Sequence, residues 1–228
     1  MDHGPSLESL VEQAYLASGE CDSQNPCFDE AKRKELDSME RNKVWTLVPP
    51  VSDRKPIGSR WVCTDKLLAD GSTISKARLV AQGFSQVKGL DYQEIFAPVI
   101  KLESIRILMS LITLKDMHFI QGDVKTAFLY GPLMEDASLK QPPGMAEPGK
   151  EDWVCRLHKA IYGLHQAPRA FYQHMKKTLV LGKFSPTSAD QSIFLQIDDG
   201  EMTILDSMST TRSWHLQVEC TWRILGRS

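Results

Sequence analysis

Apolar residues recur at helical spacing in two stretches of the first half of the chain. Between residues 28 and 42, apolar side chains stand three to five positions apart among charged ones. This spacing predicts an amphipathic helix that ends near Asn42. The segment 102–115 carries a broader apolar stripe and is expected to be a helix that buries the stripe in the core. The stripe consists of Leu102, Ile105, Leu108, Met109 and Ile112.

A third helix is expected to begin within the segment 159–172 and to continue to about residue 181. Pro168 suits the first turn of a helix, and Gly182 stands where a helix would end. The start of this helix is unusually rich in polar residues for a segment that serves packing alone. Gln166 and Arg169 are placed there, where unpaired backbone N–H groups favour anions.

Shorter stretches rich in branched and aromatic residues predict strands. Residues 44–48 form one short strand that two prolines terminate, and residues 154–157 form another. The segments 60–68 and 74–80 are predicted to pair as a hairpin. Gly71 lies between them and tolerates the positive φ that a tight turn needs.

A second hairpin is expected to join residues 192–197 to residues 202–205 through the acidic turn at 198–200. Residues 119–128 are interpreted as the end of a further strand and the turn that follows it. Strands and helices in this order predict an α+β fold with a mostly antiparallel sheet and helices packed on it.

Asp123 is the candidate for chemistry within that last strand. In an extended chain it shares one face with Phe119 and Gln121, so a carboxylate stands among partly apolar neighbours. Two interpretations remain open. The side chain is solvated at an edge or caps the following turn, or it is a ligand for magnesium, which prefers hard oxygen atoms.

Charge is distributed unevenly although the 228-residue chain has a formal net charge of only -2. Residues 54–88 hold seven basic and two acidic side chains, and residues 153–183 hold no acidic one. Lys76 and Arg78 stand two positions apart on a predicted strand, so both point from the same face. Such segments favour a nucleic-acid or nucleotide groove, or they are ordinary solvated basic faces.

Composition places the chain among ordinary globular proteins, with 42% apolar and 25% charged residues. The five cysteines are widely spread and have no spacing typical of zinc ligands, so reduced thiols in a cytoplasmic or nuclear protein are expected. The first residues lack the charge and apolar run of a secretion signal, and no stretch is long enough to span a membrane. A secreted or membrane protein is therefore not expected.

Several of these stretches, in their order and spacing, resemble the reverse transcriptase domain of Ty1/copia-type LTR retrotransposons. Each motif alone is weak, but the ordered set is specific, and the resemblance covers residues 28–205. The matching positions are Trp45 and the segments 59–62, 76–84, 91–92, 96–99, 123–129, 140–144 and 157–172.

The resemblance implies a right-hand polymerase with fingers and palm that copies an RNA or DNA template into DNA by two-metal chemistry. Template-primer and deoxynucleoside triphosphates are the implied partners, and magnesium is the implied cofactor. Asp123 matches the first catalytic aspartate and a metal ligand. Val124 would offer its backbone carbonyl to a metal.

The resemblance also assigns residues to the nucleotide pocket. Lys76 and Arg78 match the cations of the fingers that neutralise the incoming triphosphate. Gln166 would line the pocket, and Phe128 occupies the place where these enzymes sense the 2′-hydroxyl of the sugar.

The chain departs from this family where a Tyr-Val-Asp-Asp-like strand should supply two further carboxylates. Nothing from Asp206 onward resembles the family, and the primer grip, thumb and RNase H regions are missing. Neither the turn aspartate Asp198 with its neighbour nor Asp206 is a convincing substitute. We therefore expect a poorly ordered lead-in at 1–27, a fingers and palm region at 28–205 and an unrelated tail at 206–228.

The expected function is that of a reverse transcriptase domain that is inactive as the chain stands. Two alternatives remain: a non-catalytic nucleic-acid-binding remnant that uses the basic segments, or a decayed and barely stable product. A frameshift, a splice join or a truncated copy would each produce the observed tail.

Overall fold

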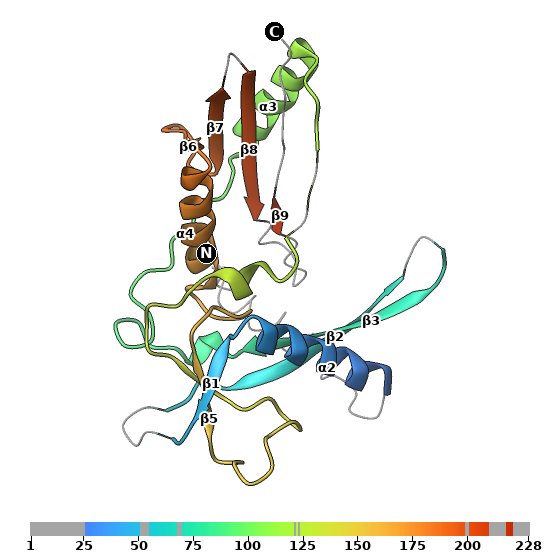
Figure 1. Ribbon diagram of the computed structural model, residues 1–228, viewed down its shortest axis with the longest axis vertical. Coiled ribbons are helices and arrows are strands. Elements are labelled where there is room, and N and C mark those ends of the chain that lie inside the picture. Colours follow the sequence, from blue (N-terminus) through green and yellow to red (C-terminus); the bar gives the residue numbers. More distant parts are fainter. Residues whose placement is uncertain are drawn as a thin grey trace, which may run out of the picture. The chain divides into compact units, whose positions relative to one another are not determined.

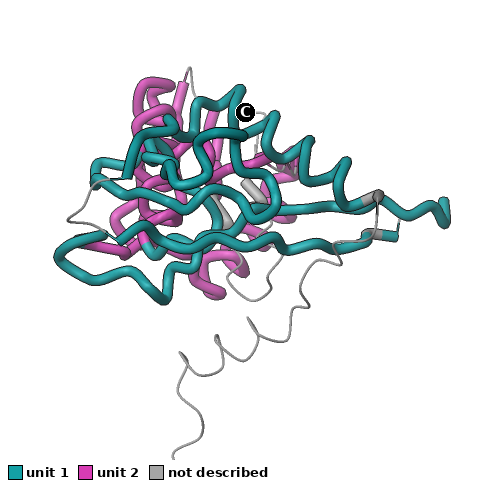
Figure 2. Tube along the Cα trace, turned by 90° about the horizontal axis from the view of Figure 1, so that it is seen from below, with its two compact units in different colours: residues 1–93, 133–165 teal, residues 94–132, 166–228 magenta. Residues whose placement is uncertain are grey.

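The computed structural model describes residues 26–50, 55–67, 70–120, 122, 124–198, 201–209 and 218–220. These residues form helices and antiparallel strands, in agreement with the predicted α+β class. The chain forms two compact units (Figure 2): residues 1–93 with 133–165, and residues 94–132 with 166–228. The expected lead-in at 1–27 lies almost wholly outside the described residues.

The described residues of the first unit include the α-helix α2, a hairpin and a three-stranded antiparallel sheet (Figure 1). The sheet has the strand order β1-β5-β4, and β2 pairs with β3 over their whole length. Gly71 in the connecting turn has φ +82, as the hairpin prediction requires. In chain order the elements are α2 (Pro26–Arg41), β1 (Trp45–Val48), β2 (Ser59–Leu67), β3 (Thr73–Ala81), η1 (Gly83–Ser85), β4 (Ser138–Lys140) and β5 (Val154–Leu157).

Helix α2 packs against β3. Ala31 and Met39 on its predicted apolar stripe are buried, and Met39 is only 1% exposed. Burial of a side chain the size of Met39 contributes about 1.5 to 3 kcal/mol, and packing of this kind stabilises a short helix. The helix, the hairpin and the strands β1 and β5 agree with the elements expected from the pattern of apolar residues.

The second unit combines an antiparallel sheet of order β6-β7-β8-β9 with two long helices. The hairpin β7–β8 and both helices agree with the sequence-based expectation. The elements are α3 (Leu102–Lys115), η2 (Ala127–Tyr130), α4 (Ala167–Leu181), β6 (Ser185–Pro186), β7 (Ile193–Asp198), β8 (Glu201–Ser209) and β9 (Val218–Cys220).

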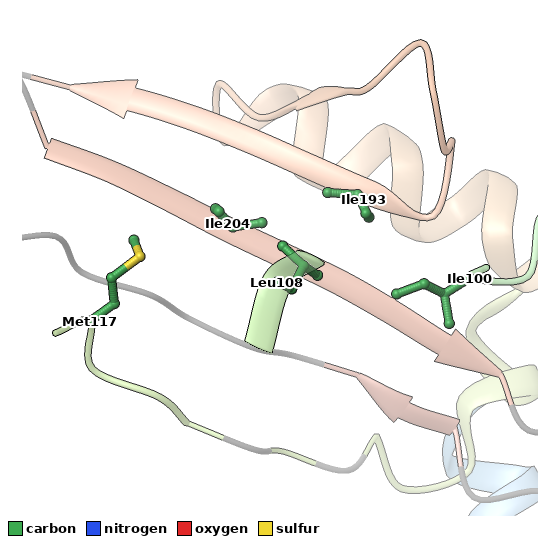
Figure 3. Packing of buried hydrophobic residues seen from close by; sticks show 5 residues of the cluster. All are labelled: Ile100, Leu108, Met117, Ile193 and Ile204. Carbon is green, nitrogen blue, oxygen red and sulfur yellow. The ribbon is translucent and has the colours of Figure 1, made fainter. Parts of the chain in front are cut away.

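The β7–β8 hairpin is covered on both faces. Leu108 of α3 packs with Ile193 and Ile204 on one face (Figure 3). Phe194, which points to the opposite face, is fully buried and lies beside the ring of Tyr172 in α4, with the ring centroids 6.4 Å apart. The two strands are therefore apolar on both sides, as expected for a strand pair between helices.

The apolar stripe predicted for α3 is only partly correct. Leu108 is buried and Ile105 and Ile112 pack around it, but Leu102 and Met109 are 57% and 42% exposed. A helix that crosses a two-stranded surface contacts it along a narrow face. The outer residues of a broad apolar stripe, here Leu102 and Met109, therefore stay outside that contact.

The strand expected at 119–123 is not formed by its described residues. Residues 117–120, 122 and 124 have no strand assignment, and residues 121 and 123 lie outside the described part. A strand needs a neighbouring backbone, and the outer edge of β8 pairs at Ser207–Ser209 with β9 instead.

The expectation of reduced thiols throughout is wrong, because at least one cysteine of the described residues is oxidised. Cys63 is disulfide-bonded. Cys155 is a buried free thiol, and its burial raises its pKa to about 12.

Asp190 joins the start of α3 to the start of β7. Its carboxylate accepts hydrogen bonds from the backbone N–H of Lys101 at 3.0 Å, from Ser104 Oγ at 2.7 Å and from the N–H of Ser192 at 3.0 Å. The side chain is 5% exposed. Burial by itself raises the pKa of Asp190, but these donors and the charge of Lys101 more than offset it, so that the pKa lies below its usual value.

Replacing Asp190 with Ala should lower the free energy of unfolding by about 2 to 4 kcal/mol, because three donors lose a charged partner. The exposed strand-end variant Asp198→Ala should change it by less than about 0.5 kcal/mol. Urea denaturation at neutral pH measures both. Because the pKa of Asp190 is lowered on folding, its contribution should disappear as the pH falls through the folded-state pKa. Equal effects of the two variants would contradict this assignment.

Candidate functional site

The two predicted cations of the first unit share one face of the β2–β3 hairpin. Lys76 is exposed and Arg78 is half-buried, two positions further along β3. In the register of the hairpin Arg78 stands opposite Val62, and Arg60 of β2 stands opposite Val80. Side chains at alternate positions and at paired positions point to the same side. This face therefore carries Arg60, Lys76 and Arg78.

The guanidinium of Arg78 lies over the ring of Tyr162, with its Cζ 5.1 Å from the ring centroid. A cation in this position is attracted by the negative face of the ring. The backbone of the same tyrosine is held by β3, because its carbonyl accepts a hydrogen bond from the N–H of Ala81 at 2.8 Å. The segment around Tyr162 thus covers the edge of β3 that does not pair with β2.

Gly163 makes this close approach possible. It has φ +88, and a Cβ atom built on it would overlap the carbonyl oxygen of Ala81 and lie 2.7 Å from Val80 Cγ1. A Cβ on Gly83 would likewise overlap the carbonyl oxygen of Gly163. Both glycines belong to segments that resemble the reverse transcriptase motifs. Their small size determines how near Tyr162 can come to β3.

Glu35 of α2 acts on the same arginine from the helix side. One of its oxygens, Oε1, is buried without a hydrogen-bond partner among the described residues. Burial raises the pKa of Glu35 to about 7, although the positive charge of Arg78 and the backbone N–H of Leu79 both lower it. Desolvation therefore outweighs the attraction of the cation, and the carboxyl group is only partly ionised near neutral pH.

The segment that follows Gly83 is tied to residues next to Tyr162. The side-chain oxygen of Gln86 accepts a hydrogen bond from the N–H of His165 at 2.9 Å. The ring of Tyr92 lies 5.0 Å from the ring of His165, centroid to centroid. These contacts connect two of the sequence motifs within the first unit.

In the second unit, Gln166 and Arg169 lie at the start of α4 as predicted. Gln166 is the N-cap residue and is 2% exposed, and its carbonyl accepts a hydrogen bond from the N–H of Ala170 at 2.9 Å. Arg169 pairs with Glu94 at 2.7 Å and donates to the carbonyl of Phe96 at 3.2 Å. The charge of Arg169 is therefore already balanced by a carboxylate.

Phe128 is a core side chain of the second unit. It is 4% exposed and meets the ring of Phe171 edge to face, with centroids 6.4 Å apart. Val124 is half-buried and lies in irregular chain before η2. Asp123, the predicted catalytic and metal-binding aspartate, lies outside the described residues.

Strand β8 places Asp206 in an apolar environment. Asp206 stands opposite Ile193 and points, like Ile204, to the face that packs against α3. It is 1% exposed. A carboxylate at such a position is costly to desolvate. The two preceding residues on this face of the strand, Met202 and Ile204, are apolar.

Sequence reasoning did not identify Glu35 or Tyr162 as partners of Arg78. The signal for Glu35 was its place on α2, four residues from both buried Ala31 and buried Met39, where the helix stripe predicts an apolar side chain. Tyr162 precedes a glycine inside a matched motif, but only the fold shows which cation its ring meets.

The described part of the chain has no group of three or more His, Cys, Asp or Glu side chains placed to hold a metal ion. Within the same residues, no helix combines the length and apolar character needed to cross a membrane.

Gly163→Ala should lower the free energy of unfolding by about 3 kcal/mol or more, because the new methyl group meets backbone as well as an unfavourable φ. Gly89→Ala is the matched control, since Gly89 has φ +87 but no atom of the described residues lies within 4 Å of the place that a Cβ would take. It should cost only about 1 kcal/mol. Thermal unfolding of the two variants separates the effects, and equal losses would argue against the close packing.

The raised pKa of Glu35 predicts a pH-dependent stability. A carboxyl group whose pKa is higher in the folded state binds more protons there, so stability should fall as the pH rises from about 4.5 to about 7. Relative to Glu35→Gln, the free energy of unfolding of the unaltered chain should fall by about 1 to 3 kcal/mol over that range. Parallel stability curves for the two proteins would show that Glu35 does not titrate in this way.

Comparison with known proteins agrees with the motifs. Residues 42–208 match the family described as reverse transcriptase (RNA-dependent DNA polymerase). The retrovirus-related Pol polyprotein from transposon RE2 of Arabidopsis thaliana is 44% identical over 168 residues, which is 73% of this chain and 12% of that polyprotein. The Ty1-BL Gag-Pol polyprotein of Saccharomyces cerevisiae is 28% identical over 157 residues, 67% of this chain and 9% of its own length.

An uncharacterised mitochondrial protein of Arabidopsis thaliana is 36% identical over 116 residues, 46% of this chain and 68% of that protein. No solved structure matches the chain. The match to the RE2 polyprotein covers only about an eighth of that polyprotein's length. The chain belongs to the reverse transcriptase family of Ty1/copia-type retrotransposon Pol polyproteins.

Proposed function

We propose that this chain is the fingers and palm part of an RNA-directed DNA polymerase and that it lacks catalysis because its reading frame changes after Leu205. The observation that carries this proposal is the sequence at the end of β8. There the chain reads Asp-Ser-Met-Ser where the resemblance leads us to expect a Tyr-Val-Asp-Asp-like sequence, although the family match extends to residue 208 and the strand to Ser209.

The nucleotide-binding part of the proposal is supported by the β2–β3 face. Arg60, Lys76 and Arg78 bring three cations to one side of a hairpin, which suits the three phosphates of a deoxynucleoside triphosphate. The family resemblance assigns Gln166 and Phe128 to the nucleotide pocket as well, and both belong to the second unit. Both are buried there, so their proposed effect on nucleotide binding is through the packing of that unit.

The catalytic part of the proposal depends on carboxylates that the chain does not hold together. Polymerases of this kind are expected to use magnesium, which neutralises phosphate charge and lowers the pKa of the attacking hydroxyl. Asp123 and the Val124 carbonyl are the proposed ligands in this chain. One carboxylate cannot hold two ions, and groups that act as a unit lose activity together.

The amino acids of the tail are compatible with a change of frame. Ser207 to Thr211 read Ser-Met-Ser-Thr-Thr. The synonymous codons TCT ATG TCG ACG ACN contain, in the frame that begins at the third base, TAT GTC GAC GAC. That frame encodes Tyr-Val-Asp-Asp, the motif that the family resemblance leads us to expect at this point.

The position of Asp206 supports the same interpretation. If Ser207 is encoded by TCT, the alternative frame joins the third base of the Asp206 codon, T or C, to the bases TC. The resulting codon, TTC or CTC, encodes Phe or Leu. An apolar residue would continue the face of β8 that carries Ile204, whereas Asp206 interrupts that face with a buried carboxylate. The alternative frame thus fits the packing of the strand better than the frame of this chain.

Sequencing the gene and its transcript across the codons for Leu205 to Thr211 tests the proposal directly. We expect the codons TCT ATG TCG ACG, followed by AC, so that the shifted frame is intact. Any other codon choice that removes Tyr-Val-Asp-Asp from the shifted frame would overturn the frame-change explanation.

Primer extension tests the functional consequence. With magnesium, poly(rA) template and oligo(dT) primer, this chain should give no extension. A version continued in the alternative frame from Leu205 through its downstream sequence should extend the primer. The matched control replaces the two restored aspartates with asparagines and should be inactive. Extension by the unaltered chain would contradict the proposed loss of catalysis.

A second candidate function is non-catalytic binding of nucleic acid through the exposed cations. Lys76 on β3 favours it, while Arg169 does not, because Glu94 already pairs with that arginine. Binding through Lys76 should weaken as salt rises, and Lys76→Gln should reduce the salt dependence by about one released counterion. Salt-independent binding would exclude this candidate.

A further inference from the structure

Arg78 lies between two groups that belong to different parts of the first unit. The ring of Tyr162 holds the guanidinium from one side at 5.1 Å, and Glu35 acts on it from α2. Arg78 is only half-buried, so part of the side chain stays accessible from solvent. The arginine can therefore face a dissolved anion while its guanidinium stays over the Tyr162 ring and its charge still acts on Glu35.

We propose that Glu35 is an internal counter-ion that controls how much positive charge Arg78 offers to a phosphate-bearing ligand. An ionised Glu35 neutralises the guanidinium and weakens binding. A protonated Glu35 leaves the full charge to the ligand. The inference rests on the proposed function in one respect, that the natural ligand is the incoming nucleoside triphosphate.

The surroundings of Glu35 make it responsive to such a ligand. Its buried Oε1 has no hydrogen-bond donor within the described part of the chain, so ionisation is already costly there. The groups of β3 that favour its charge are the Arg78 guanidinium and the Leu79 N–H. When an anion binds to Arg78, part of that stabilisation is lost and Glu35 takes up a proton more readily.

Other charges near Glu35 are already engaged or lie elsewhere on the hairpin. On α2, Lys32 pairs with Asp29 at 3.2 Å and Lys34 pairs with Glu30 at 2.6 Å. On the hairpin, Arg60 and Lys76 share the face of Arg78 and add positive charge that also favours an anion. Arg78 is the cation that acts on Glu35 most strongly.

The role proposed for Glu35 predicts a pH-dependent affinity for anions. Sulfate is the probe, because it does not titrate between about pH 5 and about pH 9 and so cannot itself produce the effect. If sulfate raises the pKa of Glu35 by one unit, the unaltered chain should bind sulfate about fivefold more tightly at about pH 6 than at about pH 8.

Three variants define the test by isothermal titration calorimetry on the full chain. At every pH, the Glu35→Gln variant should bind sulfate as tightly as the unaltered chain binds it at low pH. Glu30→Gln is the matched control, since Glu30 lies on the exposed side of the same helix and pairs with Lys34, and it should keep the pH dependence. Arg78→Gln should abolish the binding.

Carbon-13 NMR of the Glu35 carboxyl group measures the pKa directly in the unaltered chain. The signal is assigned by its loss in the Glu35→Gln variant. The pKa should be near 7 in the free chain and should rise when sulfate is added. Binding of sulfate without pH dependence, no binding at all, or a pKa that sulfate leaves unchanged would each overturn the inference. If the frame-restored polymerase is inactive while this pH profile holds, the proposed function fails and the counter-ion role of Glu35 stands.

Discussion

The outer edge of β3 imposes the constraint on which the rest of the first unit depends. This strand pairs with β2 on one side only, so the backbone N–H groups on its other side need partners from elsewhere. The carbonyl of Tyr162 accepts a hydrogen bond from the N–H of Ala81. The N–H of Leu79 interacts with the Glu35 carboxyl group and lowers its pKa. Covering this edge therefore brings an aromatic ring and a carboxyl group to the same arginine.

Packing and chemistry are linked through that edge. Tyr162 can approach β3 only because the next residue is Gly163, whose backbone leaves no room for a Cβ beside Ala81. The ring then lies against Arg78, and the half-buried Glu35, whose Oε1 is buried, is proposed to set how much charge the arginine retains. A backbone requirement of one strand thus decides the electrostatics of the proposed nucleotide-binding face.

The second unit illustrates the opposite relation, in which a strand continues through a buried charged residue. Backbone pairing continues along β8 as far as Ser209, past the buried Asp206. Strand pairing uses groups that every residue carries, so β8 persists. Side-chain character does change along the strand, because Asp206 lies on the same face as the apolar Ile204.

The sequence by itself determined the local elements and the family. The hairpin around Gly71, the strand 154–157 and the helix 102–115 follow from spacing, turn residues and apolar periodicity, which act between near neighbours. The motifs around Lys76, Arg78 and Gly163 identified the reverse transcriptase likeness. The roles assigned to Asp123, Gln166 and Phe128 stay predictions, because they depend on ligands rather than on local structure.

Tertiary structure alone decided which distant residues meet. It excluded a strand over the described residues of 119–123, because the edge of β8 pairs with β9. It also brought Glu35 and Tyr162 to Arg78 from positions 43 and 84 residues away in the chain. Such contacts depend on how whole elements pack, and the burial that raises the pKa of Glu35 exists only once α2 lies against β3.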